Sequence, residues 1–150
     1  MGTLSEKLLK LQEFAESGVP LDLILIAVNE TKANFQNRIF NSEEGAKDAK
    51  GKGLGKYSNR YAKYRQAKGR QTKVVDLELT GSLRRDFKVL KNENNIAIKV
   101  TSESEQKKVK YLEENYKTKI FSLNDEEYNA CLNKSARLIL DEIINIYKNG

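Results

Sequence analysis

The hydroxyl residues Thr80 and Ser82, on either side of Gly81, are the side chains whose types and spacing could do chemistry in this chain. A serine or threonine becomes a nucleophile when a neighbouring base, most often histidine, takes its proton. The chain of 150 residues contains no histidine, so a serine–histidine relay is excluded. Glycine adopts positive φ without steric cost, and flanking hydroxyls satisfy backbone groups that a sharp turn leaves unpaired. We therefore interpret Thr80, Gly81 and Ser82 as a structural turn.

Carboxylates cluster at two places, Glu113 with Glu114 and residues 125–127, where a pair of them could act as acid and base or bind a divalent cation. Asn124 followed three residues later by Glu predicts a capping box, which explains the second cluster as a helix start. We expect the first cluster on the solvated side of a short helix. With one cysteine, Cys131, and no histidine, a Cys/His zinc site and an intrachain disulfide are excluded. We expect no catalytic residue, no metal and no cofactor, and therefore no enzyme.

Basic residues concentrate within residues 41–73, a stretch with five glycines and no sustained apolar period, which we call the basic segment. Between residues 45 and 73 ten basic residues accompany one acidic residue, a net charge of +9 in a chain whose total is +6. Long loops in compact domains are usually functional or disordered, so we expect an extended arm or loop that contacts a partner. The side chains predicted to make that contact are Lys47, Lys50, Lys52, Lys56, Tyr57, Arg60, Tyr61, Arg65, Lys68 and Arg70.

Two chemistries fit this segment. Cations neutralise DNA phosphates, and tyrosines stack on bases of single strands. The same cations fit an acidic protein surface equally well, and the residues alone leave both partners open. The glycine–lysine run at 51–56 is not a phosphate-binding loop, because Tyr57 stands where that motif needs Ser or Thr.

Hydrophobic spacing predicts the elements that position these residues, all within one domain of residues 1–150. Apolar stripes predict two long helices at about 21–40 and 125–148, and alternation predicts a hairpin at about 86–100. Short helices are expected near 4–15, 58–67 and 104–116, and short strands at 74–77 and 119–121. The fold class is therefore α+β, with a small antiparallel sheet packed against the two long helices.

The longest apolar run, residues 23–28, is six residues long, whereas a membrane span needs about 20. We expect neither a signal peptide nor membrane contact, and synthesis in the cytoplasm.

The order of these features resembles the tailed-bacteriophage neck and tail-completion proteins, a virion morphogenesis family of head–tail connectors. The resemblance is carried by an apolar helix, a glycine loop, a Tyr/Arg/Lys stretch, a Leu-x-x-Thr-Gly-x-Leu turn and the approach to the closing helix. The residues concerned are Asn34–Phe40, Gly53–Ser58, Tyr61, Arg65, Gly69, Leu77–Phe87 and Ile120–Glu127.

The resemblance implies a structural virion protein without enzymatic activity, made in the bacterial host cytoplasm and located in the neck or tail of the virion. Copies would form a homo-oligomeric ring at the head–tail junction that joins the portal or its adaptor to the tail. The sheet would contact neighbouring subunits, and the basic segment would contact neighbouring proteins or, non-specifically, the packaged DNA. The alternative function is a small basic protein that binds nucleic acid non-specifically through residues 45–73.

Overall fold

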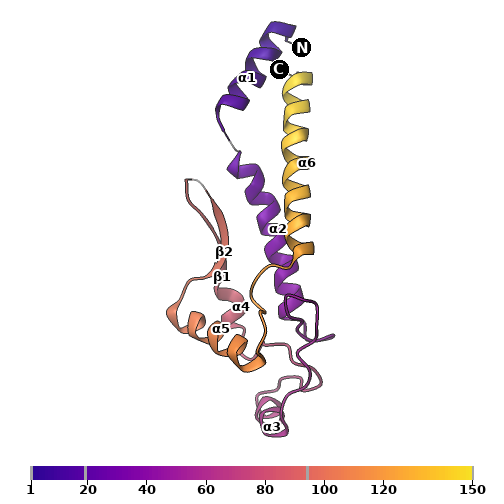
Figure 1. The fold of residues 1–150 in the computed structure, drawn as a ribbon, viewed down its shortest axis with the longest axis vertical. Coiled ribbons are helices and arrows are strands. Elements are labelled where there is room, and N and C mark those ends of the chain that lie inside the picture. Colours follow the sequence, from indigo (N-terminus) through magenta and orange to yellow (C-terminus); the bar gives the residue numbers. More distant parts are fainter. Residues whose placement is uncertain (1, 19, 94, 150) are drawn as a thin grey trace.

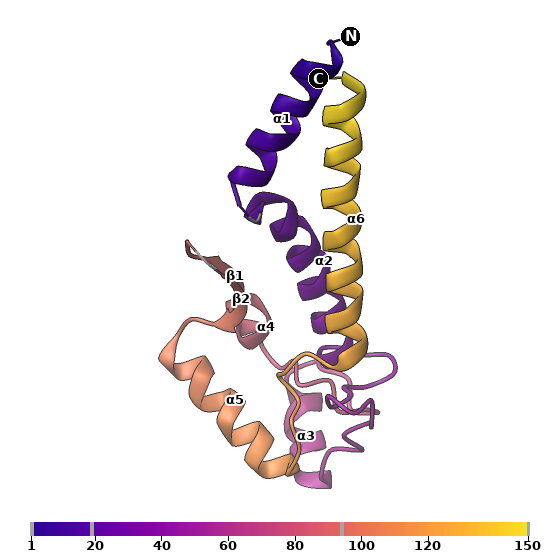
Figure 2. The ribbon, with the colours of Figure 1, turned by 45° about the horizontal axis from the view of Figure 1, so that its top comes forward.

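The computed structural model describes residues 2–18, 20–93 and 95–149. Its elements are α1 (Leu4–Glu16), α2 (Leu21–Ile39), α3 (Asn59–Ala67), α4 (Ser82–Asp86), β1 (Phe87–Lys91), β2 (Ile96–Val100), α5 (Glu103–Tyr116) and α6 (Asp125–Asn149). Helices α1, α2 and α6 form a long helical stem, in which the start of α1 and the end of α6 lie at the same tip (Figure 1). The remaining elements form the base, with α3 at the end of the molecule opposite to that tip (Figure 1 and Figure 2).

Side-chain contacts link the two long helices at the point where α2 ends and α6 begins. The predicted capping box is confirmed, because Asn124 Oδ1 accepts from the Glu127 N–H at 2.7 Å and Glu127 Oε2 accepts from the Asn124 N–H at 3.0 Å. Arg38 near the end of α2 donates from Nε to Glu127 Oε1 at 2.7 Å, and both side chains are nearly buried. Its guanidinium also donates to the backbone carbonyls of Ile120 and Ser122. This arginine therefore holds the predicted long helices together.

The predicted hairpin forms, with β1 and β2 antiparallel in a register that pairs Phe87 with Val100 and Lys91 with Ile96. The class α+β is confirmed, but the long helices do not share the sheet as expected. α2 packs on both strands, whereas the main contact of α6 is with α2. A broad apolar stripe on α2 leaves room for both neighbours, so α2 occupies the layer between the hairpin and α6.

The short strands predicted at 74–77 and 119–121 are wrong, because the described part of the chain contains no strand besides β1 and β2. In place of strand pairing, a side chain bonds the backbone of the second segment. Glu113 Oε1 accepts from the N–H groups of Ile120 and Phe121 at 2.9 and 3.0 Å. The expected solvated position of Glu113 is wrong for the same reason, since its carboxylate is half-buried beneath this segment. Burial opposes ionisation, but the two N–H groups and Lys119 hold the pKa of Glu113 below its ordinary value.

The core lies where α2 meets the base. Phe87 is at its centre, with the Phe35 ring edge-on at 5.2 Å and the Phe121 ring stacked at 5.8 Å between centroids. The buried members of the core are Phe35, Ile39, Phe40, Leu83, Phe87, Val100 and Ile120. Because Leu83 belongs to this cluster, the Thr80–Ser82 turn is attached directly to the core.

Candidate functional site

Of the extended arm or loop expected for the basic segment, the structure has a loop that folds back on the body of the protein. Lys47 and Gly53 form an isolated antiparallel bridge, and Asp48 lies buried inside the loop between them. Asp48 Oδ1 accepts from the Lys50 and Lys52 N–H groups at 2.9 Å each, and Oδ2 accepts from Thr118 Oγ1 at 2.8 Å. Burial alone would raise the pKa of Asp48, but these hydrogen bonds outweigh it and lower the pKa. Asp48, the one acid between residues 45 and 73, therefore anchors the loop.

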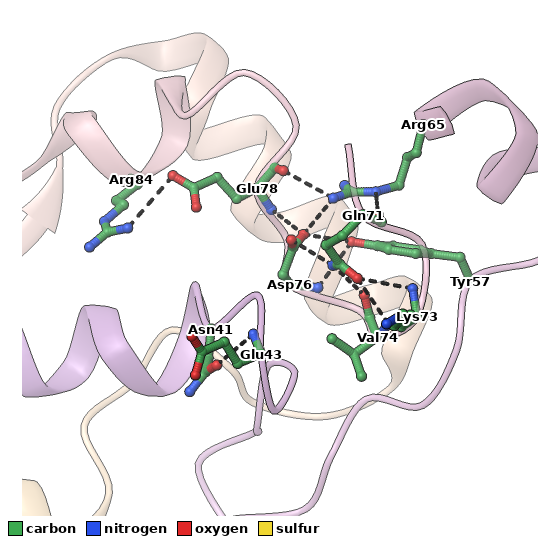
Figure 3. A network of polar contacts seen from close by, with 10 residues as sticks. All are labelled: Asn41, Glu43, Tyr57, Arg65, Gln71, Lys73, Val74, Asp76, Glu78 and Arg84. Carbon is green, nitrogen blue, oxygen red and sulfur yellow. Dashed lines mark hydrogen bonds and ion pairs between the residues drawn. The ribbon is translucent and has the colours of Figure 1, made fainter. Parts of the chain in front are cut away.

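A second anchor is the buried ion pair of Arg65 and Asp76, drawn in Figure 3. Arg65 Nη2 donates to Asp76 Oδ1 at 2.7 Å, and Nε donates to the Gln71 carbonyl at 3.1 Å. The Arg65 guanidinium also lies 4.4 Å from the centre of the Tyr57 ring. Arg65 was predicted to contact a partner, and that prediction is wrong, because its side chain is 1% exposed and bonded within the chain. A buried charge needs such a partner, and Asp76 lies beyond the segment that the sequence marked as basic.

The Tyr57 hydroxyl completes this network as both a donor and an acceptor. The hydroxyl donates to Asp76 Oδ1 at 2.9 Å and accepts from the Asp76 N–H at 3.0 Å. Burial raises the pKa of the Tyr57 hydroxyl, so the hydroxyl keeps its proton. Gln71 donates to the other carboxylate oxygen of Asp76 at 2.7 Å (Figure 3). The network fixes the position of the basic segment relative to the chain that enters the turn.

The predicted turn at Thr80, Gly81 and Ser82 is present, and Gly81 adopts φ +78°, as its residue type indicated. Thr80 Oγ1 accepts from the Ser82 N–H at 3.3 Å and donates to Ser82 Oγ at 3.1 Å. Arg85 Nη1 donates to the Thr80 carbonyl at 3.2 Å. Within the turn the two hydroxyls thus bond the backbone and one another, and the turn opens α4 directly after Gly81.

A cavity of about 650 Å³ lies between the basic segment, the turn and α5. It combines apolar and aromatic walls with cations. The basic segment contributes Lys56, Tyr57, Ser58, Tyr61 and Arg65, the chain around the turn contributes residues 77–84, and α5 contributes Lys108, Tyr111, Leu112, Asn115 and Tyr116. Lys108 Nζ links two of the walls, since it donates to Ser82 Oγ at 3.1 Å and to Glu105 Oε1 at 2.7 Å.

The structure thus unites two features that the sequence presented separately. Lys56, Tyr57 and Tyr61 line the same cavity as the Thr80–Ser82 turn. Sequence reasoning missed the wall from α5, although a signal existed: Lys108, Leu112 and Asn115 recur at helical spacing and must share a face. The cavity suits a ligand that carries an apolar or aromatic group beside a negative charge, because leucines and tyrosines surround it and lysines lie among them.

The other predicted contact residues lie outside this cavity. Lys50, Lys52, Arg60 and Lys68 are exposed, and Lys68 Nζ lies 5.7 Å from the centre of the Tyr64 ring. Lys47 is paired with Glu44 at 3.4 Å, and Arg70 is half-buried, with no hydrogen-bond partner for Nε among the described residues. None of these cations lines the cavity.

Within residues 2–18, 20–93 and 95–149, no group of three or more His, Cys, Asp or Glu side chains is arranged to hold a metal ion. Across the same residues, no helix has both the length and the apolar character to cross a membrane. Comparisons with protein-family models, with curated proteins and with solved structures find no match to this chain, so the interpretation of this site rests on its own geometry.

Proposed function

We propose that this protein is a structural component of a tailed-bacteriophage virion that forms an oligomeric ring at the head–tail junction and joins the portal or its adaptor to the tail. The observation that carries the proposal is that exposed apolar side chains lie on the helical stem and exposed cations lie on the basic segment of the base. The free tip of the stem and the base lie at opposite ends of an elongated molecule (Figure 1). A protein that joins two assemblies needs two such contact surfaces. The family resemblance of the sequence supports the same role.

The apolar surface belongs to the stem. No residue of α1 is buried, and its Leu4, Leu8 and Leu9 side chains are more than half exposed. On α6, Leu132, Leu140 and Tyr147 are each about half exposed. Contiguous exposed apolar residues mark contact surfaces in proteins that assemble.

The cationic surface belongs to the basic segment. Of its ten cations only Lys47 and Arg65 form a salt bridge with another described residue. The eight others are Lys50, Lys52, Lys56, Arg60, Lys63, Lys68, Arg70 and Lys73. Because Asp48 and Asp76 hold the segment, these charges lie on a fixed surface. An acidic partner surface therefore binds them without the entropy cost of ordering a flexible arm.

Mass measurement and negative-stain imaging of the purified protein test the proposal, alone and mixed with portal, adaptor and tail proteins from the genome that encodes it. We expect ring-shaped particles and a complex with at least one of those proteins. The triple variant Lys50→Glu, Lys52→Glu, Lys56→Glu is expected to lose the complex and keep the ring, since all three side chains are exposed and Asp48 holds the loop through backbone groups. A protein that stays monomeric and binds none of these proteins contradicts the proposal.

Non-specific binding of nucleic acid is the second candidate function, because the basic segment carries partly exposed tyrosines as well as cations, and Lys68 Nζ lies 5.7 Å from the centre of the Tyr64 ring. Tyr61 and Tyr64 are stacked at 5.8 Å between centroids and are 38% and 48% exposed. If this function holds, affinity for single-stranded DNA falls steeply with salt, and the triple lysine variant flattens that dependence. Absence of binding at low salt removes this candidate. Charge reversal is the suitable change, since deletion of residues 45–73 would also remove Arg65 from its buried pair.

A further inference from the structure

The turn holds a hydroxyl whose own hydrogen has no acceptor. Ser82 Oγ accepts from Thr80 Oγ1 and from Lys108 Nζ, each at 3.1 Å. Since a hydroxyl has two lone pairs and one hydrogen, both acceptor positions of Ser82 are occupied and only its O–H is left. None of the described residues accepts that hydrogen. Ser82 is half-buried and lines the cavity, so it offers a free donor to a ligand there.

Lys108 offers a second free donor beside the first. Its ammonium group has three hydrogens, and it donates to Ser82 Oγ and to Glu105 Oε1. Within the described part of the chain the third hydrogen has no acceptor. Because the Ser82 and Lys108 donor atoms are 3.1 Å apart, both can donate to one carboxylate, and a charged acceptor strengthens each hydrogen bond. We call these two groups the donor pair.

The cavity extends from the donor pair along α5. Lys108, Leu112 and Tyr116 line it in turn, and the end of α5 lies beside α3 (Figure 1 and Figure 2). Tyr61 of α3 lines the same cavity, and burial together with this neighbour raises the pKa of Tyr116. Eight residues of helix rise by about 12 Å, so the donor pair and the two tyrosines lie at opposite ends of the cavity.

Between these ends the walls are apolar and part of the lining is open to solvent. The apolar wall includes Leu77, Leu79, Leu83 and Leu112. A site for a free small molecule encloses most of its ligand, whereas Tyr61 and Tyr111 on this lining are 38% and 65% exposed. An extended polypeptide advances about 3.3–3.6 Å per residue, so two of its side chains, three or four positions apart, reach both ends. The cavity therefore fits an extended segment better than an enclosed small molecule.

The net charge of the cavity matches a single carboxylate. All but one of its cations have an acid as partner, in the pairs Arg65 with Asp76, Arg84 with Glu78 and Lys108 with Glu105. Lys56 has no such partner in the described ranges, so one positive charge is in excess. A nucleic acid strand brings a negative charge with every nucleotide, which this balance does not fit. A polypeptide segment with one acidic residue does fit it.

We propose that the cavity binds an extended segment of a partner protein, in which one Asp or Glu lies three or four positions from an aromatic residue or leucine. The donor pair binds the carboxylate, and the apolar side chain packs against Tyr61, Leu112 and Tyr116. This inference goes beyond the proposed ring, since one chain contains the whole site. A protein that stays monomeric would contradict the ring and leave this inference standing.

Titration of the ¹⁵N-labelled full chain with a defined peptide, followed by NMR, tests the inference. The probe is acetyl-Glu-Gly-Ser-Gly-Phe-amide, called the Glu peptide, and two controls replace its Glu by Gln or its Phe by Ala. We expect the Glu peptide to shift the amide signals of residues 80–83 and 108–116. Each control peptide should bind roughly tenfold more weakly, since it lacks either the charged hydrogen-bond acceptor or the apolar group.

Two variants locate the carboxylate, each with a matched control at an exposed position outside the cavity. Ser82→Ala and Lys108→Met remove one donor each, and Ser122→Ala and Lys107→Met are their controls. We expect the first two to weaken the Glu peptide by roughly tenfold and both controls to change its affinity by less than about twofold. The Gln peptide should lose less than about twofold in Ser82→Ala and Lys108→Met, because it lacks the charge and reports only damage to the rest of the cavity.

Four results overturn the inference. The first is an absence of shifts at the cavity with millimolar Glu peptide. The second is equal affinity for the Glu and Gln peptides, which removes the carboxylate site. The third is binding of 3-phenylpropionate as tight as that of the Glu peptide, because the carboxylate and ring of this acid are too close together to span the cavity. The fourth is a thymidine hexanucleotide that shifts the same signals and is weakened by Lys108→Met, which makes the cavity a nucleic-acid site.

Discussion

At the base, around Arg65 and Asp76, buried polar groups find their partners within the chain, whereas the helical stem leaves large apolar side chains without any. The Arg65 guanidinium has a carboxylate, two carbonyls and an aromatic ring around it. By contrast, α1 contains no buried residue, and Leu132, Leu140 and Ile144 on α6 are 49%, 55% and 41% exposed. The polar network around Arg65 is thus closed within one chain, whereas the stem leaves large apolar side chains exposed.

This difference shows which part of the molecule sets its stability and which part is available for partners. Substitutions at the base remove contacts that exist in one chain and should lower the free energy of unfolding. Substitutions on the outer surface of the stem should leave the monomer almost unchanged and alter association alone.

The largest expected effect comes from breaking the buried pair. Arg65→Ala leaves the Asp76 carboxylate buried without its guanidinium, and loss of one partner of a buried ion pair costs about 3–5 kcal/mol. Urea denaturation followed by circular dichroism measures this loss. Lys63→Ala, at an exposed position of the same helix, is the control and should change stability by less than about 0.5 kcal/mol. Equal stability of the two variants would contradict the importance of the pair.

A smaller effect is expected at the turn. Gly81→Ala forces a side chain into the left-handed region at φ +78°, which costs roughly 1–2 kcal/mol. An added Cβ would also lie 2.7 Å from Arg85 Nη1, at the flexible end of that side chain. Gly51→Ala has a similar φ of +81° but open space around the Cβ, so thermal unfolding of both variants separates backbone strain from the contact. If Gly81→Ala is as stable as the wild type, the turn does not depend on glycine.

Acid should weaken the link between α4 and α5 through Asp86. Its carboxylate accepts from the N–H groups of Thr101 and Ser102 at 2.9 and 2.8 Å, and these bonds lower the pKa of Asp86 to about 2 from an ordinary 3.8. Since the folded pKa is the lower one, the stabilisation is fully present above pH 3.8 and is lost as pH falls through about 2. The stability difference between wild type and Asp86→Asn, measured by urea denaturation against pH, should narrow over this range. A stability difference that stays constant over this pH range would contradict the role of the Asp86 carboxylate.

The smallest effect is expected on the exposed surface of α6. Leu140→Ala removes a side chain that is 55% exposed, so the free energy of unfolding should change by less than about 0.5 kcal/mol. Leu83→Ala, in the core, is the contrast and should cost about 2–5 kcal/mol. Thermal unfolding of both variants at low protein concentration measures the difference. A large loss in Leu140→Ala would show that Leu140 packs within its own chain.

The correct sequence-based predictions concern residues whose partners are near in the chain. Asn124 and Glu127 are three residues apart, Gly81 acts on its own backbone, and the strands of the hairpin are joined by a short turn. The incorrect ones concern side chains with distant partners. Arg65 was assigned to the surface because most arginines are there, and Glu113 was assigned to solvent for the same reason.

The sequence by itself determined the α+β class, the two long helices with the α6 cap, the hairpin and the glycine turn, because local hydrogen bonds and hydrophobic periodicity specify each of them. Only the tertiary structure decided that the basic segment folds back onto Asp76, that α5 closes a cavity against the turn, and that Leu132 and Leu140 on α6 stay exposed. A hydrophobic period is the same whether a helix is covered by its own chain or by another copy. Three-dimensional packing alone separates these two cases.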